Sequence, residues 1–115
     1  MEHSRCTLNP ATNTAVLDLI GDLDWSGVQH AAALWSHLPS WPTSVILDLT
    51  DVSFIDACGL SFLLDLRDEV LGAGSQMYVW ALSAPVRRLL DVAGTAALFP
   101  VRCNLSASPL VAECA

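Results

Sequence analysis

The sequence predicts an α/β domain in which successive strand–helix units build a mostly parallel sheet with flanking helices. Short apolar runs with strand-like patterns alternate along the chain with segments that have helical spacing. Most of the predicted helices follow an Asp or Ser and end near Gly or Pro, which are ordinary start and stop signals. The 115 residues contain no linker, repeat or low-complexity tract, so we expect one domain over residues 1–115.

The first half of the chain predicts two strands and a helix. Residues 15–23 alternate apolar and polar side chains, as a half-buried strand does, and a shorter strand is expected before them at residues 6–8. Residues 26–38 carry apolar side chains at helical spacing. Asp24 or Ser26 can cap this helix, because both side chains can accept a hydrogen bond from its free N–H groups.

The second half continues the alternation. Residues 44–49 form a near-continuous apolar run, which is typical of a strand covered on both faces. A helix is expected over residues 57–71, followed by a strand at 76–82 and a helix within 83–94. A last strand is expected at residues 99–105.

Composition and charge exclude several classes of function. The chain is 53% hydrophobic and 15% charged, with a formal charge of −7 and no lysine. An acidic surface repels phosphate backbones, so no nucleic-acid binding is expected, and the missing lysine excludes P-loop and Schiff-base chemistry. No apolar run is long enough for membrane insertion, and the first ten residues do not resemble a signal peptide. We therefore expect a cytoplasmic protein.

The four cysteines do not indicate a metal site or a disulfide framework. Cys6, Cys58, Cys103 and Cys114 form no CxxC pair and have no histidine at metal-ligand spacing, so we expect free thiols and no cofactor or metal. Cys58 is the strongest hint of an enzyme, since a helix N-terminus favours a thiolate. Nearby acids oppose that effect and no base is evident, so a packing role is favoured.

Acidic residues gather where predicted strands end and helices begin, which is where sites form in α/β folds. We expect Asp56 to cap the central helix by accepting a hydrogen bond from the N–H of Cys58 or Gly59. If their strands are parallel neighbours, Asp24 and Asp56 share one rim. A magnesium site made by Asp22, Asp24 and Asp56 is an alternative, although scattered solvated acids are favoured.

Five stretches in this order resemble the STAS domain family, which includes anti-sigma factor antagonists. They are GDLD, VILDLTDVSFIDACGL, GAG, APVRRLLDVAG and LFP, and the resemblance is strongest over residues 15–101. The Asp-small-small-Gly-Leu core, residues 56–60, is its most specific part. The resemblance implies a single STAS-like domain that binds a partner and is not an enzyme.

In this family, single-domain members bind an anti-sigma factor that is also an ATPase-fold serine kinase, and sigma is released. The kinase phosphorylates a Ser or Thr directly after the motif's Asp, and the complex separates. Here that phosphoacceptor position holds Ala57, which has no hydroxyl, so this switch is expected to be missing. The resemblance implies a partner-binding surface at Asp22, Asp24, Asp56, Ala57, Cys58, Gly59 and Ser61.

Other readings remain open at this point. The chain could be a STAS subunit that docks on a lipid-transport ATPase or a stress-signalling assembly, or it could carry a small ligand. The four tryptophans are interpreted as packing residues of the core or rim rather than as a ligand site. The sequence leaves the oligomeric state open between a monomer and a weak homodimer.

Overall fold

The computed structural model describes residues 4–99 and residue 101, which form one sheet with helices packed against it. Strands and helices alternate along most of this part of the chain. In chain order the elements are β1 (Arg5–Asn9), β2 (Thr14–Leu23), α1 (Trp25–Ser36), β3 (Ser44–Ile55), α2 (Ala57–Gly72), β4 (Gln76–Leu82), α3 (Ala84–Val92) and the short 3-10 helix η1 (Ala96–Leu98).

The sheet is mixed and mostly parallel, as the sequence predicts. Its strand order is β1-β2-β3-β4, with β1 antiparallel to β2 and the other two pairs parallel. The parallel strands put their carboxyl ends at one edge of the sheet, and helices α1, α2 and α3 each begin there. This edge is therefore the place where a site is expected in an α/β fold.

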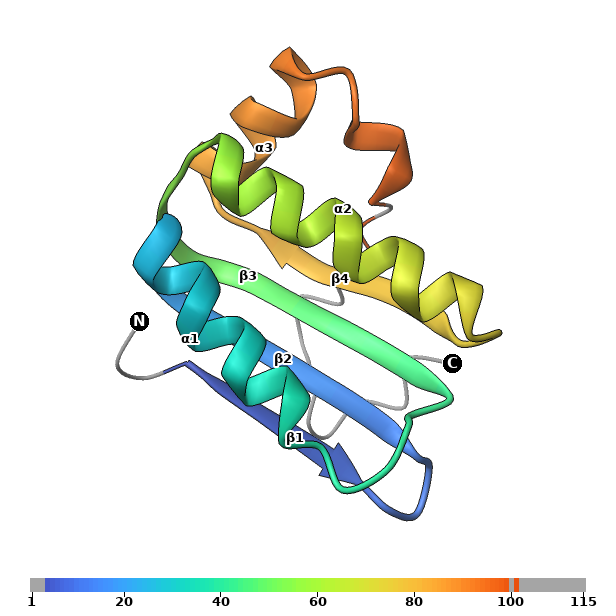
Figure 1. Ribbon diagram of the computed structural model, residues 1–115. Helices are drawn as coiled ribbons and strands as arrows, with labels where there is room; N and C mark the ends of the chain where they lie inside the picture. The colour runs from blue at the N-terminus through green and yellow to red at the C-terminus, as the bar shows by residue number, and fades with distance from the viewer. Residues whose placement is uncertain (1–3, 100, 102–115) are drawn as a thin grey trace.

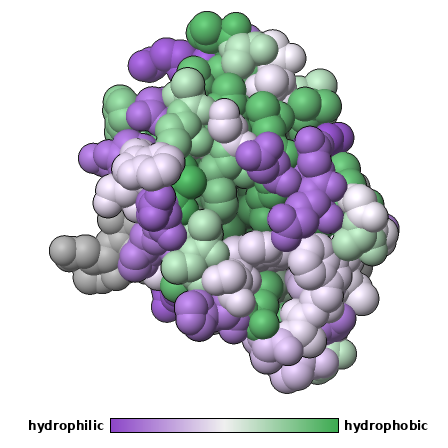
Figure 2. Space-filling model, in the orientation of Figure 1, coloured by the Kyte–Doolittle hydropathy of each residue, from purple (hydrophilic) through white to green (hydrophobic). Residues whose placement is uncertain are grey.

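Helices α1 and α2 cover one face of the sheet, and α3 completes the main core with its buried residues Val86 and Leu90. Helix α1 lies in front of β2, and α2 lies beside it in front of β3 and β4. Helix α3 and η1 lie beyond α2, on the β4 side (Figure 1). Apolar side chains gather where α1 and α2 meet, and polar side chains occupy their outer flanks (Figure 2). None of the helices in the described part of the chain is long and apolar enough to cross a membrane.

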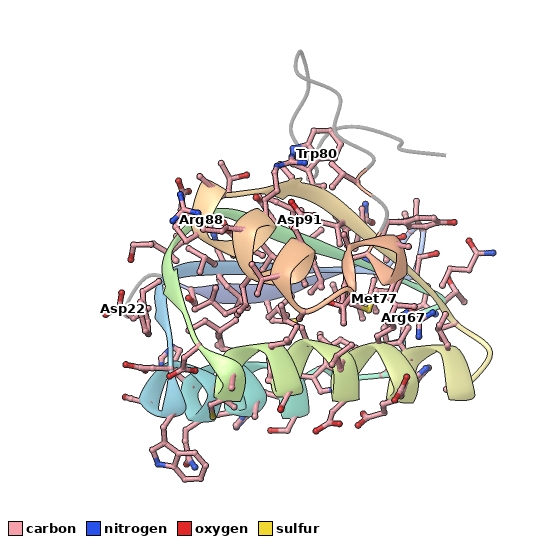
Figure 3. The ribbon with its side chains drawn as sticks, turned by 90° about the horizontal axis from the view of Figure 1, so that it is seen from above. Asp22, Arg67, Met77, Trp80, Arg88 and Asp91 are labelled. Carbon is pink, nitrogen blue, oxygen red and sulfur yellow. The ribbon has the colours of Figure 1, made fainter. Side chains whose placement is uncertain are left out.

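The core follows the strand alternation. The side chains that face α1 and α2 are fully buried and include Leu17, Leu19, Leu47 and Leu49. Apolar side chains of this size contribute about 1.5–3 kcal/mol each when they leave water. The opposite face carries a smaller cluster of Val16, Ile46 and Trp80, and Trp80 points away from α1 and α2 (Figure 3).

The structure corrects three predicted elements. Strand β3 runs to Ile55, six residues beyond the predicted end at Leu49, because it keeps pairing with β2 across two register shifts. Helix α1 ends at Ser36, before the predicted residue 38. Phe99 belongs to no strand and Val101 makes only an isolated parallel bridge to Val79; the rest of the strand predicted at 99–105 lies outside the described residues.

Asp18 lies among other acids on the sheet face opposite α1 and α2. It is register-paired with Asp48 on the neighbouring strand, and its Oδ2 is 3.6 Å from Nε of Arg5. Burial is the main cause that raises the pKa of the Asp18 carboxyl; Asp48 and Asp51 add to this, whereas Arg5 opposes it. The folded protein therefore binds this proton more tightly than the unfolded chain does.

This shift predicts a pH-dependent gain in stability for Asp18→Asn. A raised folded pKa gives stability that is present in acid and is lost as the pH rises and the carboxylate forms. The neutral amide avoids that loss, so the variant should unfold at higher denaturant than the wild type at neutral pH. The difference should shrink as the pH falls below the folded pKa of Asp18. Urea unfolding at several pH values measures it.

Asp65→Asn is the control, because Asp65 is exposed on α2 and its change should stay within about 0.5 kcal/mol. A less stable Asp18→Asn protein at neutral pH would show that the pair with Arg5 outweighs burial and the neighbouring acids.

Candidate functional site

Two helices begin side by side at the carboxyl edge of the sheet, and an aspartate caps each of them. Asp24 precedes α1 in extended backbone geometry, and its Oδ1 accepts a hydrogen bond from the N–H of Gly27 at 3.0 Å. Asp56 precedes α2 in the same way, and its Oδ1 accepts from the N–H of Gly59 at 3.1 Å. Each such cap stabilises its helix by about 1 kcal/mol.

The strand register makes the two caps neighbours. Leu23 and Ile55 are paired across β2 and β3, and the next residue along each chain segment is the capping aspartate. The sequence left open whether Asp24 and Asp56 share one rim, and the structure places them together there.

Gly59 fixes how closely α2 approaches β2. A Cβ atom built on Gly59 would lie 2.3 Å from the carbonyl oxygen of Leu23 and 2.8 Å from Cγ1 of Ile55. Real Cβ atoms do not come so near a backbone oxygen, so only glycine permits this contact. Gly59 is buried, and its role here is to let the first turn of α2 rest on the end of β2.

The remaining predicted residues lie around these caps in different ways. Asp22 is exposed, and its Oδ1 accepts a hydrogen bond from Oγ of Ser53 at 2.9 Å. Ala57 is exposed in the first turn of α2, and Cys58 is a half-buried free thiol. Ser61 is also exposed, one helical turn beyond Ala57 and thus on the same side of α2. We call Asp22, Asp24, Trp25, Ser53, Phe54, Asp56, Ala57 and Cys58 the acidic rim.

Two aromatic residues of the acidic rim were missed by the sequence reasoning. Trp25 is 66% exposed and Phe54 is 48% exposed, although both are large and apolar. Trp25 stands two residues before the buried Gly27, and residues two apart point to nearly opposite sides of a helix. This spacing in the sequence could have predicted that Trp25 is exposed. Phe54 lies in the part of β3 beyond Leu49, where the sequence predicts that the strand ends.

The charge changes sign farther along the same edge. Arg87 and Arg88 are exposed in α3, which begins where β4 ends, and neither forms an ion pair with a described residue. Arg88 and Asp22 lie toward the same end of the sheet (Figure 3). The edge is therefore acidic over β2 and β3 and basic beside β4, which gives a partner a preferred orientation.

The magnesium alternative finds no support in this geometry. Within residues 4–99 and residue 101, no three His, Cys, Asp or Glu side chains are grouped so that they could hold a metal ion. One carboxylate oxygen each of Asp22, Asp24 and Asp56 already accepts a hydrogen bond from a hydroxyl or a helix N–H group. The geometry instead offers acids, aromatic rings and helix ends at the surface, which suits protein binding.

The fold and the rim define a small α/β domain that presents two capped helix N-termini at one edge. The STAS domain family model matches residues 7–108, and the chain belongs to this family. An anti-sigma F factor antagonist of Paenibacillus polymyxa is 32% identical over 60 residues, which are 52% of this chain and 51% of that protein. The match thus spans about half the length of that relative.

Three solved structures have the same fold. The unphosphorylated anti-sigma factor antagonist SpoIIAA matches with a TM-score of 0.71 at 20% identity, over 93% of this chain and 90% of that one. An anti-sigma factor antagonist from Mycobacterium paratuberculosis matches with a TM-score of 0.66 at 22% identity, over 91% and 90%. The phosphorylated form of SpoIIAA from Bacillus matches with a TM-score of 0.63 at 18% identity, over 93% of each chain.

The close contact at Gly59 predicts that adding one methyl group there lowers the stability of the protein markedly. Gly59→Ala should lower the free energy of unfolding by about 1–3 kcal/mol, because the Cβ cannot fit against the Leu23 carbonyl unless α2 moves. Chemical denaturation followed by circular dichroism measures the change.

Gly72→Ala is the matched control, since nothing lies within 4 Å of a Cβ at Gly72, at the end of the same helix. Alanine favours a helix over glycine, so this variant should be as stable as the wild type or up to about 1 kcal/mol more stable. Equal stabilities for the two variants would contradict the close approach at Gly59.

Proposed function

We propose that this chain is a non-enzymatic regulatory binding module that acts as an anti-sigma factor antagonist. Its partner is an anti-sigma factor of the ATPase-fold serine kinase type, which releases its sigma factor when it binds this chain. The similarity to anti-sigma factor antagonists supports this proposal. The cytoplasm, where sigma factors act, is the compartment that the proposal implies.

The observation that carries the proposal is the make-up of the acidic rim. Two aspartate-capped helix ends meet there, with Trp25 and Phe54 exposed beside them. Interfaces are rich in aromatic anchors, and acids at their edges select partners with basic side chains. Asp22, Asp24 and Asp56 would meet arginine or lysine on the partner, while the two rings supply apolar contact.

The rim has little that could perform chemistry. Cys58 is the one strong nucleophile on it, and among the described residues it has no hydrogen bond to a histidine or any other base. The described histidines, His30 and His37, belong to α1 and to the residue after it, and the His37 ring bonds to the backbone oxygen of Ala33. A nucleophile without a base fits a binding surface better than an active site.

Ala57 would leave the docking surface without a phosphate switch. It stands directly after Asp56, is exposed in the first turn of α2, and has no hydroxyl to modify. The nearby hydroxyls differ in position: Ser53 lies on β3 and donates to Asp22, while Ser61 is one turn farther along α2. We therefore propose that this chain binds its kinase without being released by phosphorylation at this position.

Three forms of the chain test this proposal when they are used as bait in an extract of the native cell. The wild type and Ala57→Ser should capture the same kinase-type anti-sigma factor. Ala57→Asp adds a charge where the rim is already acidic, and it should bind about tenfold more weakly, or ~1.4 kcal/mol. Titration calorimetry with the captured partner gives the affinities.

A melting curve controls for folding, because an acid is tolerated in the first turn of a helix. With ATP present, Ala57→Ser should become phosphorylated and dissociate, whereas the wild type should stay bound. Capture of a transport ATPase alone, or unchanged affinity in folded Ala57→Asp, would contradict the proposal.

A further inference from the structure

A pocket lies at the opposite end of the molecule from the acidic rim. It is formed by the end of α1, the connection from residue 37 to residue 43, and the last turns of α2. Figure 1 shows that the ends of α1 and α2 lie away from the edge at which both helices begin. Its volume is about 450 Å³, and it is a partly open hollow at the surface rather than an enclosed cavity. Its walls include Trp35, Leu38, Trp41, Pro42 and Glu69.

Two tryptophan rings form a corner of this pocket. The ring centroids of Trp35 and Trp41 are 5.7 Å apart, and the ring planes meet at 81°. Trp41 is 44% exposed and Trp35 is half-buried, so both rings leave apolar surface open to the pocket.

Hydrogen bonds hold both rings in place. Trp35 Nε1 donates to Oε1 of Glu69 at 3.2 Å, and Trp41 Nε1 donates to Oγ of Ser75 at 2.9 Å. The buried Ser75 hydroxyl in turn donates to the carbonyl of Pro42 at 2.7 Å. Both indole N–H groups are thus satisfied within the protein. What remains for a ligand is the part of each electron-rich ring face that the edge-to-face contact between the two rings leaves open.

The connection that carries Trp41 is also fixed. The side-chain amide of Asn13 donates to the Trp41 carbonyl at 3.2 Å, and the N–H of Thr43 donates to the Asn13 carbonyl at 2.9 Å. A corner that is already ordered loses little conformational entropy when a ligand enters.

The charge of the pocket favours a positively charged ligand. Glu69 is its one ionisable wall residue, and no arginine or histidine lines it. An anion would meet a carboxylate and two negative ring faces. A cation over the face of a tryptophan is attracted by the ring quadrupole, and aromatic corners of this kind bind quaternary ammonium groups. A single carboxylate is too few ligands for a metal ion.

We infer that this pocket binds an organic ammonium cation, above all one with methylated nitrogen such as a choline group. The methyl groups would rest on the faces of Trp35 and Trp41, and the charge would lie near Glu69. This pocket shares no residue with the acidic rim, so a test of ligand binding here does not depend on the proposed partner.

Choline is the first probe, with detection by the four indole N–H signals of the ¹⁵N-labelled protein. The signals of Trp35 and Trp41 should shift and saturate, while those of Trp25, on the acidic rim, and Trp80, on the other sheet face, stay in place. The neutral alcohol 3,3-dimethylbutanol has the shape of choline without the charge, and it should bind severalfold more weakly.

Glu69→Gln keeps an oxygen for the Trp35 N–H and removes the charge, so it should weaken choline binding severalfold. Asp68→Asn is the matched control: it removes a neighbouring exposed charge outside the pocket and should leave the affinity unchanged. Co-sedimentation with phosphatidylcholine vesicles, compared with phosphatidylglycerol vesicles, tells whether a lipid headgroup or free choline is the source of the cation.

Equal binding of choline and the neutral alcohol would overturn the inference, because the rings would then offer only apolar surface. So would an unchanged affinity in Glu69→Gln, or a shift of all four indole signals together.

Discussion

The close contact between Gly59 and the Leu23 carbonyl is the constraint on which the proposed binding edge depends. A side chain at this position would collide with backbone at 2.3 Å, so the first turn of α2 can rest on the end of β2 only because the residue is glycine. The same turn supplies the N–H that Asp56 caps. Gly59 therefore sets both how closely α2 packs on β2 and where the capping Asp56 lies on the acidic rim.

This contact allows the acidic rim to combine negative charge with exposed aromatic surface. The capping acids stay near the surface because helix N–H groups hold them, and this interaction also favours their negative charge. Trp25 and Phe54 remain exposed beside them. Exposure of apolar side chains to water is unfavourable, so a partner that covers the two rings gains binding free energy. Ala57 leaves the tip of α2 small and uncharged, so a partner backbone can come close.

Local signals in the sequence were enough for much of this structure. The strand at residues 76–82 has the bounds that the sequence predicts, and α2 begins at the predicted residue 57. Both predictions rest on hydrophobic periodicity and capping residues, which are local features of the sequence. The cap at Asp56 was predicted for the same reason. The six extra residues of β3 were not predicted, since Asp51 and Ser53 suggest a loop until pairing with β2 is known. The contact of Trp35 with Trp41 crosses a helix end, and no local pattern encodes it.

Amide hydrogen exchange shows whether the acidic rim is the surface that a partner covers. Exchange would be compared for the chain alone and bound to the proposed anti-sigma factor, since buried amides exchange more slowly. If the partner binds the acidic rim, exchange should be slower at residues 22–26 and 53–61 and unchanged at residues 36–43 and 69–76. Slower exchange confined to residues 36–43 and 69–76 would instead place the partner over the tryptophan pocket and rule out the acidic rim as its binding surface.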